Sequence, residues 1–163
     1  MQQWPDSIAV STAPLEDARN FRKVDDRRYT AGQPSEAQLA DAASKGVTVV
    51  VNLALHDDPR YSLRDEAGCV RGLGMDYVHI PVQFKAPTEQ DLMDFFTAMD
   101  AHGDEKVLVH CAANYRVTAF VGLYRVIRQG WTPDKAFEPM RTVWEPDEVW
   151  TRFISEMIER HRR

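Results

Sequence analysis

The sequence predicts an α/β fold of three layers, with a mainly parallel central sheet flanked by helices. Apolar runs typical of strands alternate with stretches whose apolar residues recur at helical spacing. The run at 47–53 is β-branched and does not alternate, as in a strand buried on both faces. With 163 residues and no repeat or linker, we expect one domain over 1–163, irregular over 1–23 and ending in helices over 131–163.

Each element has its own local signal. A short edge strand is expected over 24–29, followed by a turn at Gly32-Gln33-Pro34. Ser35 and Gln38 form a capping-box pattern at the start of a helix over 36–45. The same arguments predict, in order, a strand over 47–53, a helix from Ser62 to Gly72, a strand over 77–82, a helix from Thr88 to Gly103, a strand over 107–109, a helix ending at Gly130, a helix beginning at Thr132-Pro133, and a last helix over 147–161.

Ligands of such sheets bind beyond the carboxyl ends of the strands. That edge is expected to carry the loops 54–61, 83–88 and 111–116. The loop 111–116 stands out because Cys111 ends an apolar run, Arg116 follows it, and a helical pattern begins there. We therefore expect the functional groups of the chain at this edge.

The chemistry of the Cys111 loop follows from its place between a strand and a helix. A helix N-terminus and nearby cations turn a thiol into a nucleophile by lowering its pKa. The amides of the loop residues are expected to form a nest for a tetrahedral anion, and Arg116 offers a planar fork to two anion oxygens. A phosphocysteine intermediate is the chemistry that this predicts. The alternative is a buried cysteine in an ordinary turn. The expected phosphate-binding residues are Ala112, Ala113, Asn114, Tyr115 and Arg116.

The segment from His110 to Thr118 resembles the signature of cysteine-dependent protein tyrosine and dual-specificity phosphatases, and the wider pattern resembles their bacterial DUF442-type, phosphatase-like subgroup. The resemblance covers about residues 24–130 and also rests on the segments 29–35, 51–53, 80–82 and 86–88. It implies a protein tyrosine phosphatase-like fold. It implies that Cys111 is the nucleophile, that His110 orients the loop and helps keep the thiolate, that Arg116 clamps the phosphoryl group, and that Thr118 bonds the cysteine sulfur.

The spacing of the arginine departs from that family. The signature has Arg sixth after the Cys and a hydroxyl residue seventh, whereas Arg116 is fifth and Thr118 is seventh. Either the loop is one residue tighter and Arg116 is the clamp, or Val117 takes the clamp position and Arg116 turns aside. Asn114 favours the second alternative because Asn tolerates left-handed backbone angles.

The residue at the position of the general acid also differs from that family, in which an Asp of the loop after the preceding strand is the acid. Gln83 stands in that loop, and no carboxylate appears there before Glu89. Losing a positioned acid typically costs about 10²–10⁴ in rate. Asp57 and Asp58 are the expected substitutes, with a polar turn before Pro59 as the competing interpretation.

Three functions remain open. The first is hydrolysis of a phosphomonoester of unknown class, of the phosphotyrosine or dual-specificity type and with weak activity if the acid is missing. The second is a non-catalytic phosphate-binding module. The third is a rhodanese-like sulfurtransferase, because rhodanese-like enzymes use a shorter loop and carry a persulfide on the Cys.

Composition limits the partners. The formal charge of −5 without a clustered basic face argues against nucleic-acid or membrane-surface binding. No apolar run reaches a membrane span, and the first residues lack a secretion signal, so we expect a cytoplasmic protein. No His or Cys spacing typical of a metal site occurs, and no cofactor is expected. Trp131, Trp144 and Trp150 are expected to pack the last helices onto the core or to line a partner surface. The oligomeric state is left open.

Overall fold

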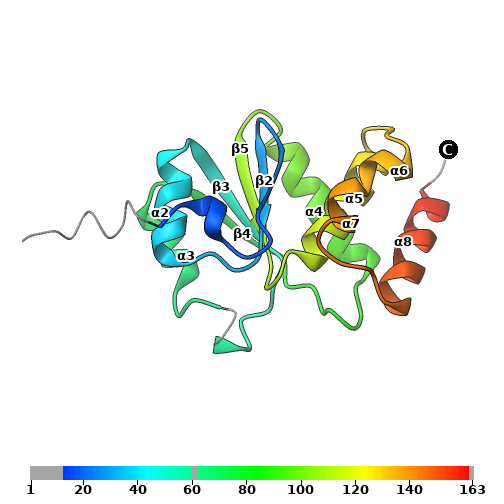
Figure 1. The fold of residues 1–163 in the computed structure, drawn as a ribbon, viewed down its shortest axis with the longest axis horizontal. Coiled ribbons are helices and arrows are strands. Elements are labelled where there is room, and N and C mark those ends of the chain that lie inside the picture. Colours follow the sequence, from blue (N-terminus) through cyan, green and yellow to red (C-terminus); the bar gives the residue numbers. More distant parts are fainter. Residues whose placement is uncertain (1–12, 60–61, 162–163) are drawn as a thin grey trace, which may run out of the picture.

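The structure is a computed structural model of the chain that describes residues 13–59 and 62–161. Five strands form one sheet in the order β1-β2-β5-β3-β4, in which only the β1–β2 pair is antiparallel. Helices α2 and α3 cover one face, and α4, α5 and the C-terminal helices lie on the other (Figure 1). The predicted three-layer, mainly parallel α/β fold is confirmed.

The elements follow the predicted order. The strands are β1 (Arg22–Asp25), β2 (Arg28–Ala31), β3 (Val47–Asn52), β4 (Asp76–His79) and β5 (Lys106–His110). The helices are the 3-10 turn η1 (Leu15–Asp17) and α2 (Glu36–Ser44), α3 (Glu66–Gly72), α4 (Glu89–Ala101), α5 (Tyr115–Ile127), α6 (Pro133–Ala136), α7 (Glu138–Arg141) and α8 (Glu148–Arg160).

The alternation of side chains in the central strands divides the core in two. Val49 and Val51 of β3 point into the layer of α4, α5 and α8, whereas Val50 points into the layer of α2 and α3. In β5, Val109 likewise points into the layer of α4, α5 and α8, and Leu108 points into the layer of α2 and α3. Both faces of β3 are therefore buried, as its run of β-branched residues predicts.

The prediction of a single edge strand over 24–29 was wrong. The chain instead makes two short strands, β1 and β2, that pair as a hairpin in which Arg22 lies opposite Thr30. The polar turn at Asp26-Arg27 separates them, and the amide of Arg27 donates to the Asp25 carboxylate at 2.9 Å. β2 is parallel to β5 and therefore lies inside the sheet, with β1 as the edge. Of the N-terminal segment expected to be irregular, residues 13–21 contain η1, and residues 1–12 lie outside the described residues.

Two further boundaries differ from those predicted. The helix expected from Ser62 begins at Glu66, because Asp65 is its N-cap and accepts from the amide of Gly68 at 3.0 Å. The strand expected over 77–82 ends at His79. Pro81 has no amide hydrogen to donate to the ladder, although the amides of Ile80 and Val82 still donate to carbonyls of the β3 end.

The C-terminal segment is helical, as expected. The helix predicted from Thr132-Pro133 is broken into α6 and α7, because Pro139 cannot donate the hydrogen bond that would continue α6. α8 begins after the N-cap Asp147, whose carboxylate accepts from the amide of Trp150 at 2.9 Å. Among the described residues, no helix is long and apolar enough to cross a membrane.

Candidate active site

The register of the parallel strands sets the place of the site. His110, the last residue of β5, lies opposite Ala31 of β2 and Asn52 of β3, and Asn52 lies opposite His79 of β4. The loops that follow these four strands therefore leave the sheet at one edge. This confirms the prediction that the loops 54–61, 83–88 and 111–116 share an edge, and it adds the turn at 32–34.

Cys111 is fully buried and directly follows β5. The loop behind it is held by its carbonyls: that of Ala112 accepts from the Gln33 amide at 3.0 Å, and that of Ala113 accepts from Asn20 Nδ2 at 3.0 Å. In a trans peptide the N–H points away from the C=O. The amides of Ala113 and Asn114 therefore point to the side opposite these anchors.

Several of these loop amides have no acceptor among the described residues. The amides of Ala112, Ala113, Tyr115 and Arg116 donate to no backbone or side-chain oxygen there, whereas Asn114 takes part in the backbone bridge between Gly32 and Ala113, and the amide of Thr118 bonds the Asn114 carbonyl. Free amides at a helix N-terminus are the donor set that a phosphate or sulfate oxygen requires. That these amides bind an anion stays a prediction.

Asn114 makes the turn from the loop into α5. Its φ of 70° lies in the left-handed region, as the residue type predicts. Its Nδ2 donates to the Asn20 carbonyl at 2.8 Å and to Thr30 Oγ1 at 3.0 Å. The side chain therefore anchors the loop to the N-terminal segment and to β2.

Of the two alternatives for the clamp position, the structure has Arg116 at the cavity. Val117 is fully buried in the hydrophobic core beneath α5. Arg116 lines a cavity of about 310 Å³ together with Ala112, and its Nη1 donates to the Val82 carbonyl at 2.8 Å. Its guanidinium lies 5.9 Å from the Phe84 ring centroid. Arg116 therefore lines the cavity although Asn114 is left-handed.

The same cavity gathers the acid candidates. Asp57 and Asp58 line it from the loop after β3, and Gln83 lines it from the loop after β4. The loop after β3 is held to the sheet by His79, whose Nε2 lies 2.7 Å from the Ala54 carbonyl oxygen. The structure thus brings together the groups that the sequence spreads over three loops. The complete lining is Ala54, Leu55, Asp57, Asp58, Gln83, Phe84, Lys85, Ala112 and Arg116.

His110 is held by a residue that sequence reasoning missed. Its Nε2 lies 2.5 Å from Oε2 of Glu66, both side chains are fully buried, and Gln33 Nε2 donates to Glu66 Oε1 at 2.9 Å. Burial opposes ionisation of Glu66, but the charge and hydrogen bond of His110 and the hydrogen bond from Gln33 outweigh it and hold the pKa of this carboxyl below its usual value. Glu66 therefore fixes the ring that precedes Cys111.

Thr118 is hydrogen-bonded to a residue of the C-terminal segment. Its hydroxyl donates to the Tyr115 carbonyl at 3.0 Å and accepts from Trp144 Nε1 at 3.0 Å. Among the described residues, its hydrogen bonds do not include the Cys111 sulfur. Tyr115 in turn stacks on Trp144 with ring centroids 4.7 Å apart. Neither Trp144 contact has a signal in the sequence, because the two segments are far apart along the chain.

A group of possible metal ligands lies at the opposite edge of the sheet. Ligand atoms of Asp76, His102 and Glu105 lie within 4.8 Å of one another near the start of β4 and β5. His102 Nδ1 lies 2.6 Å from Glu105 Oε2, and Thr48 Oγ1 donates to Glu105 Oε1 at 2.8 Å. His102 and Glu105 are thus paired with each other, and the three residues do not line the cavity at Arg116.

Comparisons with known proteins agree with this geometry. Residues 5–150 match the family described as DSP-PTPase phosphatase fused to NAD+ kinase. The crystal structure of a candidate phosphatase (DUF442) from Shewanella putrefaciens CN-32 is 32% identical, with a TM-score of 0.81 over 91% of this chain and 97% of that one. No curated protein sequence matches significantly. The chain therefore belongs to the DSP-PTPase, phosphatase-like family.

Two more distant structures share the fold. The active form of Tk-PTP is 21% identical, with a TM-score of 0.73 over 86% of this chain and 97% of that chain. A cysteine-to-serine variant of TpbA from P. aeruginosa, solved in complex with pTyr, is 21% identical, with a TM-score of 0.63 over 84% and 81% of the two chains. Both similarities concern the fold alone.

Proposed function

We propose that this protein is a cysteine-dependent phosphomonoesterase. The observation that carries the proposal is the set of unbonded amides of Ala112, Ala113, Tyr115 and Arg116 directly after the buried Cys111, together with a cavity that Ala112 and Arg116 line. Tetrahedral anions bind such amides, and an arginine fork adds two charge-assisted hydrogen bonds. Membership of the phosphatase-like family favours this function over sulfur transfer.

The reaction divides into two displacements at phosphorus. The Cys111 thiolate attacks, the bond between phosphorus and the ester oxygen breaks, and the leaving oxygen takes a proton from an acid. Water then attacks the phosphocysteine, the S–P bond breaks, and inorganic phosphate and the thiolate are released. The amides and Arg116 hold the charge on the non-bridging oxygens in both steps. Asp58 or Asp57 is proposed as the acid, since both lie on the cavity.

Turnover of an aryl phosphate tests the proposal. The wild-type protein is expected to release phosphate, and Cys111→Ser is expected to release none because the serine hydroxyl is a poor nucleophile at neutral pH. Cys69→Ser is the matched control, since Cys69 is the other free cysteine and lies on α3. Equal inactivity of wild type and Cys111→Ser over a range of pH would contradict catalysis.

The proposed role of Arg116 as the phosphate clamp is tested by measuring vanadate binding. Arg116→Lys is expected to weaken vanadate binding about tenfold, because an ammonium group cannot present two parallel donors. Calorimetric titration of wild type and variant measures the loss. Unchanged affinity in Arg116→Lys would show that this side chain does not clamp the anion.

A phosphate-binding module without catalysis is the second candidate. Gln83 favours it, because this side chain lines the cavity from the loop in which the family carries its acid, and an amide cannot give up a proton. Vanadate or phosphate that raises the melting temperature without any turnover would identify this function. A thiosulfate-to-cyanide assay, with a persulfide mass on Cys111, would instead identify a sulfurtransferase.

A further inference from the structure

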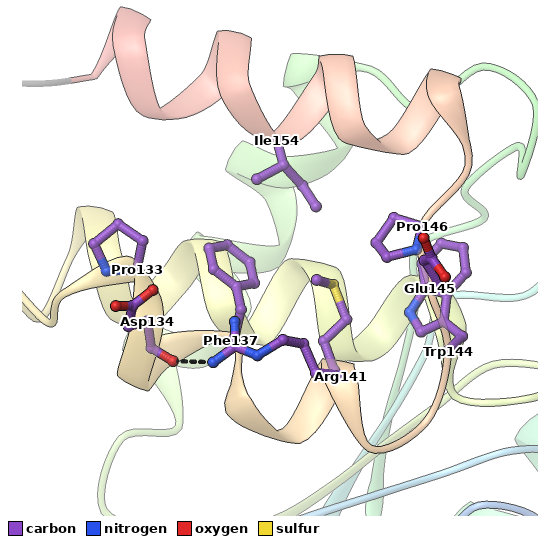
Figure 2. A pocket seen from close by; sticks show the side chains of 9 residues that line it. Pro133, Asp134, Phe137, Arg141, Trp144, Glu145, Pro146 and Ile154 are labelled. Atoms are coloured by element: carbon purple, nitrogen blue, oxygen red, sulfur yellow. Dashed lines mark hydrogen bonds between the residues drawn. The ribbon is translucent and has the colours of Figure 1, made fainter.

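A second cavity, of about 550 Å³, is lined by residues of α6, α7, α8 and the segment before α8, and it is larger than the cavity at Arg116. Its walls are mainly apolar: Phe137 and Met140 are buried, and Ile154 points from α8 into the space above Phe137 (Figure 2). Pockets of this size with apolar walls and a few polar groups are typical of small-molecule sites. The proposed function does not use this cavity.

The polar groups stand at its two ends. Figure 2 shows the Arg141 guanidinium beside Asp134 at one end, where it donates to the Asp134 carbonyl. At the other end Glu145 lies with Trp144 and Pro146. Among the described residues, neither the Asp134 nor the Glu145 carboxylate is paired with a cation. The end at Glu145 therefore combines a negative charge with the Trp144 side chain.

We propose that this cavity binds a small molecule with an apolar body and a positively charged group. The body lies between Phe137 and Ile154, and the charge lies at Glu145 and Trp144. A cation gains there both from the carboxylate and from the indole ring, which is the most effective aromatic partner of a cation. An anion at this end would meet the carboxylate of Glu145, since the Arg141 guanidinium lies at the other end.

The same tryptophan connects this cavity to the cysteine loop. Trp144 stacks on Tyr115 with an interplanar angle of 2° and donates to Thr118 Oγ1. Tyr115 is the first residue of α5 and precedes Arg116. A ligand that contacts Trp144 therefore acts on the first turn of α5. The consequence of this contact for phosphate binding rests on the proposed function, whereas the ligand site does not.

The site is tested with three matched probes: naphthylethylammonium, naphthylethanol and naphthylpropanoate. Titrations followed by NMR are expected to show that the ammonium probe binds best, with a shift of the Trp144 indole N–H resonance and no shift of Trp131. Trp131 is the control because its ring packs on Arg125, with the guanidinium 4.1 Å from the ring centroid, and does not line the cavity. Binding of the propanoate as tightly as the ammonium probe, or no binding, would overturn the proposal.

The contribution of the Glu145 charge to ligand binding is tested with two variants. Glu145→Gln is expected to weaken binding of the ammonium probe about two- to fivefold, as for an exposed ion pair. Glu138→Gln, on α7 but outside the cavity, is expected to leave the affinity unchanged. Equal effects of the two variants would contradict a cation at Glu145.

The connection between this cavity and the cysteine loop is tested by NMR on the phosphate-free protein, through the backbone amide resonances of Tyr115 and Arg116. Both are expected to shift as the ammonium probe binds, whereas the Asp26 amide in the hairpin turn is not. Unchanged resonances at Tyr115 and Arg116 would overturn the connection. If phosphate does not bind to the free protein, the proposed function is contradicted. The probe titrations still test whether the second cavity binds a cationic ligand.

Discussion

At the scale of residues, the site depends on buried polar side chains that are held by one another. His110 and Glu66 are both fully buried, and such groups are retained only when they are paired. Each ring nitrogen of His110 faces an oxygen, at Glu66 Oε2 and at the Cys111 carbonyl, which lies 3.3 Å away. The orientation of the ring is thus set from both sides, directly before Cys111.

Glu66→Gln removes the charge and nearly preserves the shape. We expect it to lower the free energy of unfolding by about 1–3 kcal/mol, as for a buried hydrogen bond to a charged group. The folded pKa of Glu66 lies below its unfolded value, so its contribution is present above about pH 4.3 and is lost as the pH falls through the folded pKa. Urea unfolding at several pH values measures both effects. The exposed Glu156→Gln is the control, and equal stability of the two variants would contradict this role of Glu66.

At the scale of elements, the turn after β2 supports the cysteine loop through the backbone. Gly32 forms an isolated bridge with Ala113, and a Cβ at Gly32 would lie 2.5 Å from the Ala112 carbonyl oxygen and 3.1 Å from the Ala113 Cα. Backbone atoms cannot swing away from such a contact as the end of a side chain can. The turn therefore needs glycine because of close approach and not because of its φ angle.

Gly32→Ala is expected to displace the cysteine loop. The strain of overpacking typically costs about 1–3 kcal/mol of folding free energy, and the shifted amides would bind vanadate more weakly. Gly72→Ala is the control, because nothing lies within 4 Å of a Cβ there. Thermal unfolding and vanadate titration of both variants measure the difference. Normal vanadate affinity in Gly32→Ala would show that the turn does not position the loop.

At the scale of the whole molecule, the C-terminal helices hold two of the loops that line the cysteine cavity. Trp144 bonds Thr118 at the start of α5, and Trp150 Nε1 donates to the Phe84 carbonyl at 2.7 Å. Phe84 belongs to the loop after β4 and lines the cavity. α8 thus fixes a wall of the site without contributing a group to it. Of the alternatives for the tryptophans, packing onto the core holds for Trp150, whereas Trp131 is exposed.

Trp150→Phe tests this support. The smaller ring leaves the Phe84 carbonyl without its donor, and we expect the free energy of unfolding to fall by about 1–3 kcal/mol. Vanadate binding should weaken less than in Arg116→Lys, because the loop after β4 moves while the amide nest remains. Trp131→Phe is the matched control at an exposed ring. A stability loss no larger in Trp150→Phe than in Trp131→Phe would refute the role of α8.

The sequence by itself determined the layers of the fold and the place of the candidate site. Val47 to Leu53 is apolar on both faces, and the capping box of Ser35 and Gln38 is present in the structure as predicted. Cys111 lies at the end of a buried strand, as its apolar run indicates. These signals are local, because periodicity, caps and turns depend on residues close together in the chain.

Only the tertiary structure decided which side chains meet at that place. The pairing of Glu66 with His110, the approach of Gly32 to Ala112, and the contacts of Trp144 join segments far apart in the sequence. Spacing alone also does not show which of Arg116 and Val117 lies beside the cavity, since that depends on how α5 packs on the core. Val117 is buried in the core beneath α5, whereas Arg116, although also largely buried, lines the cavity and donates to the Val82 carbonyl.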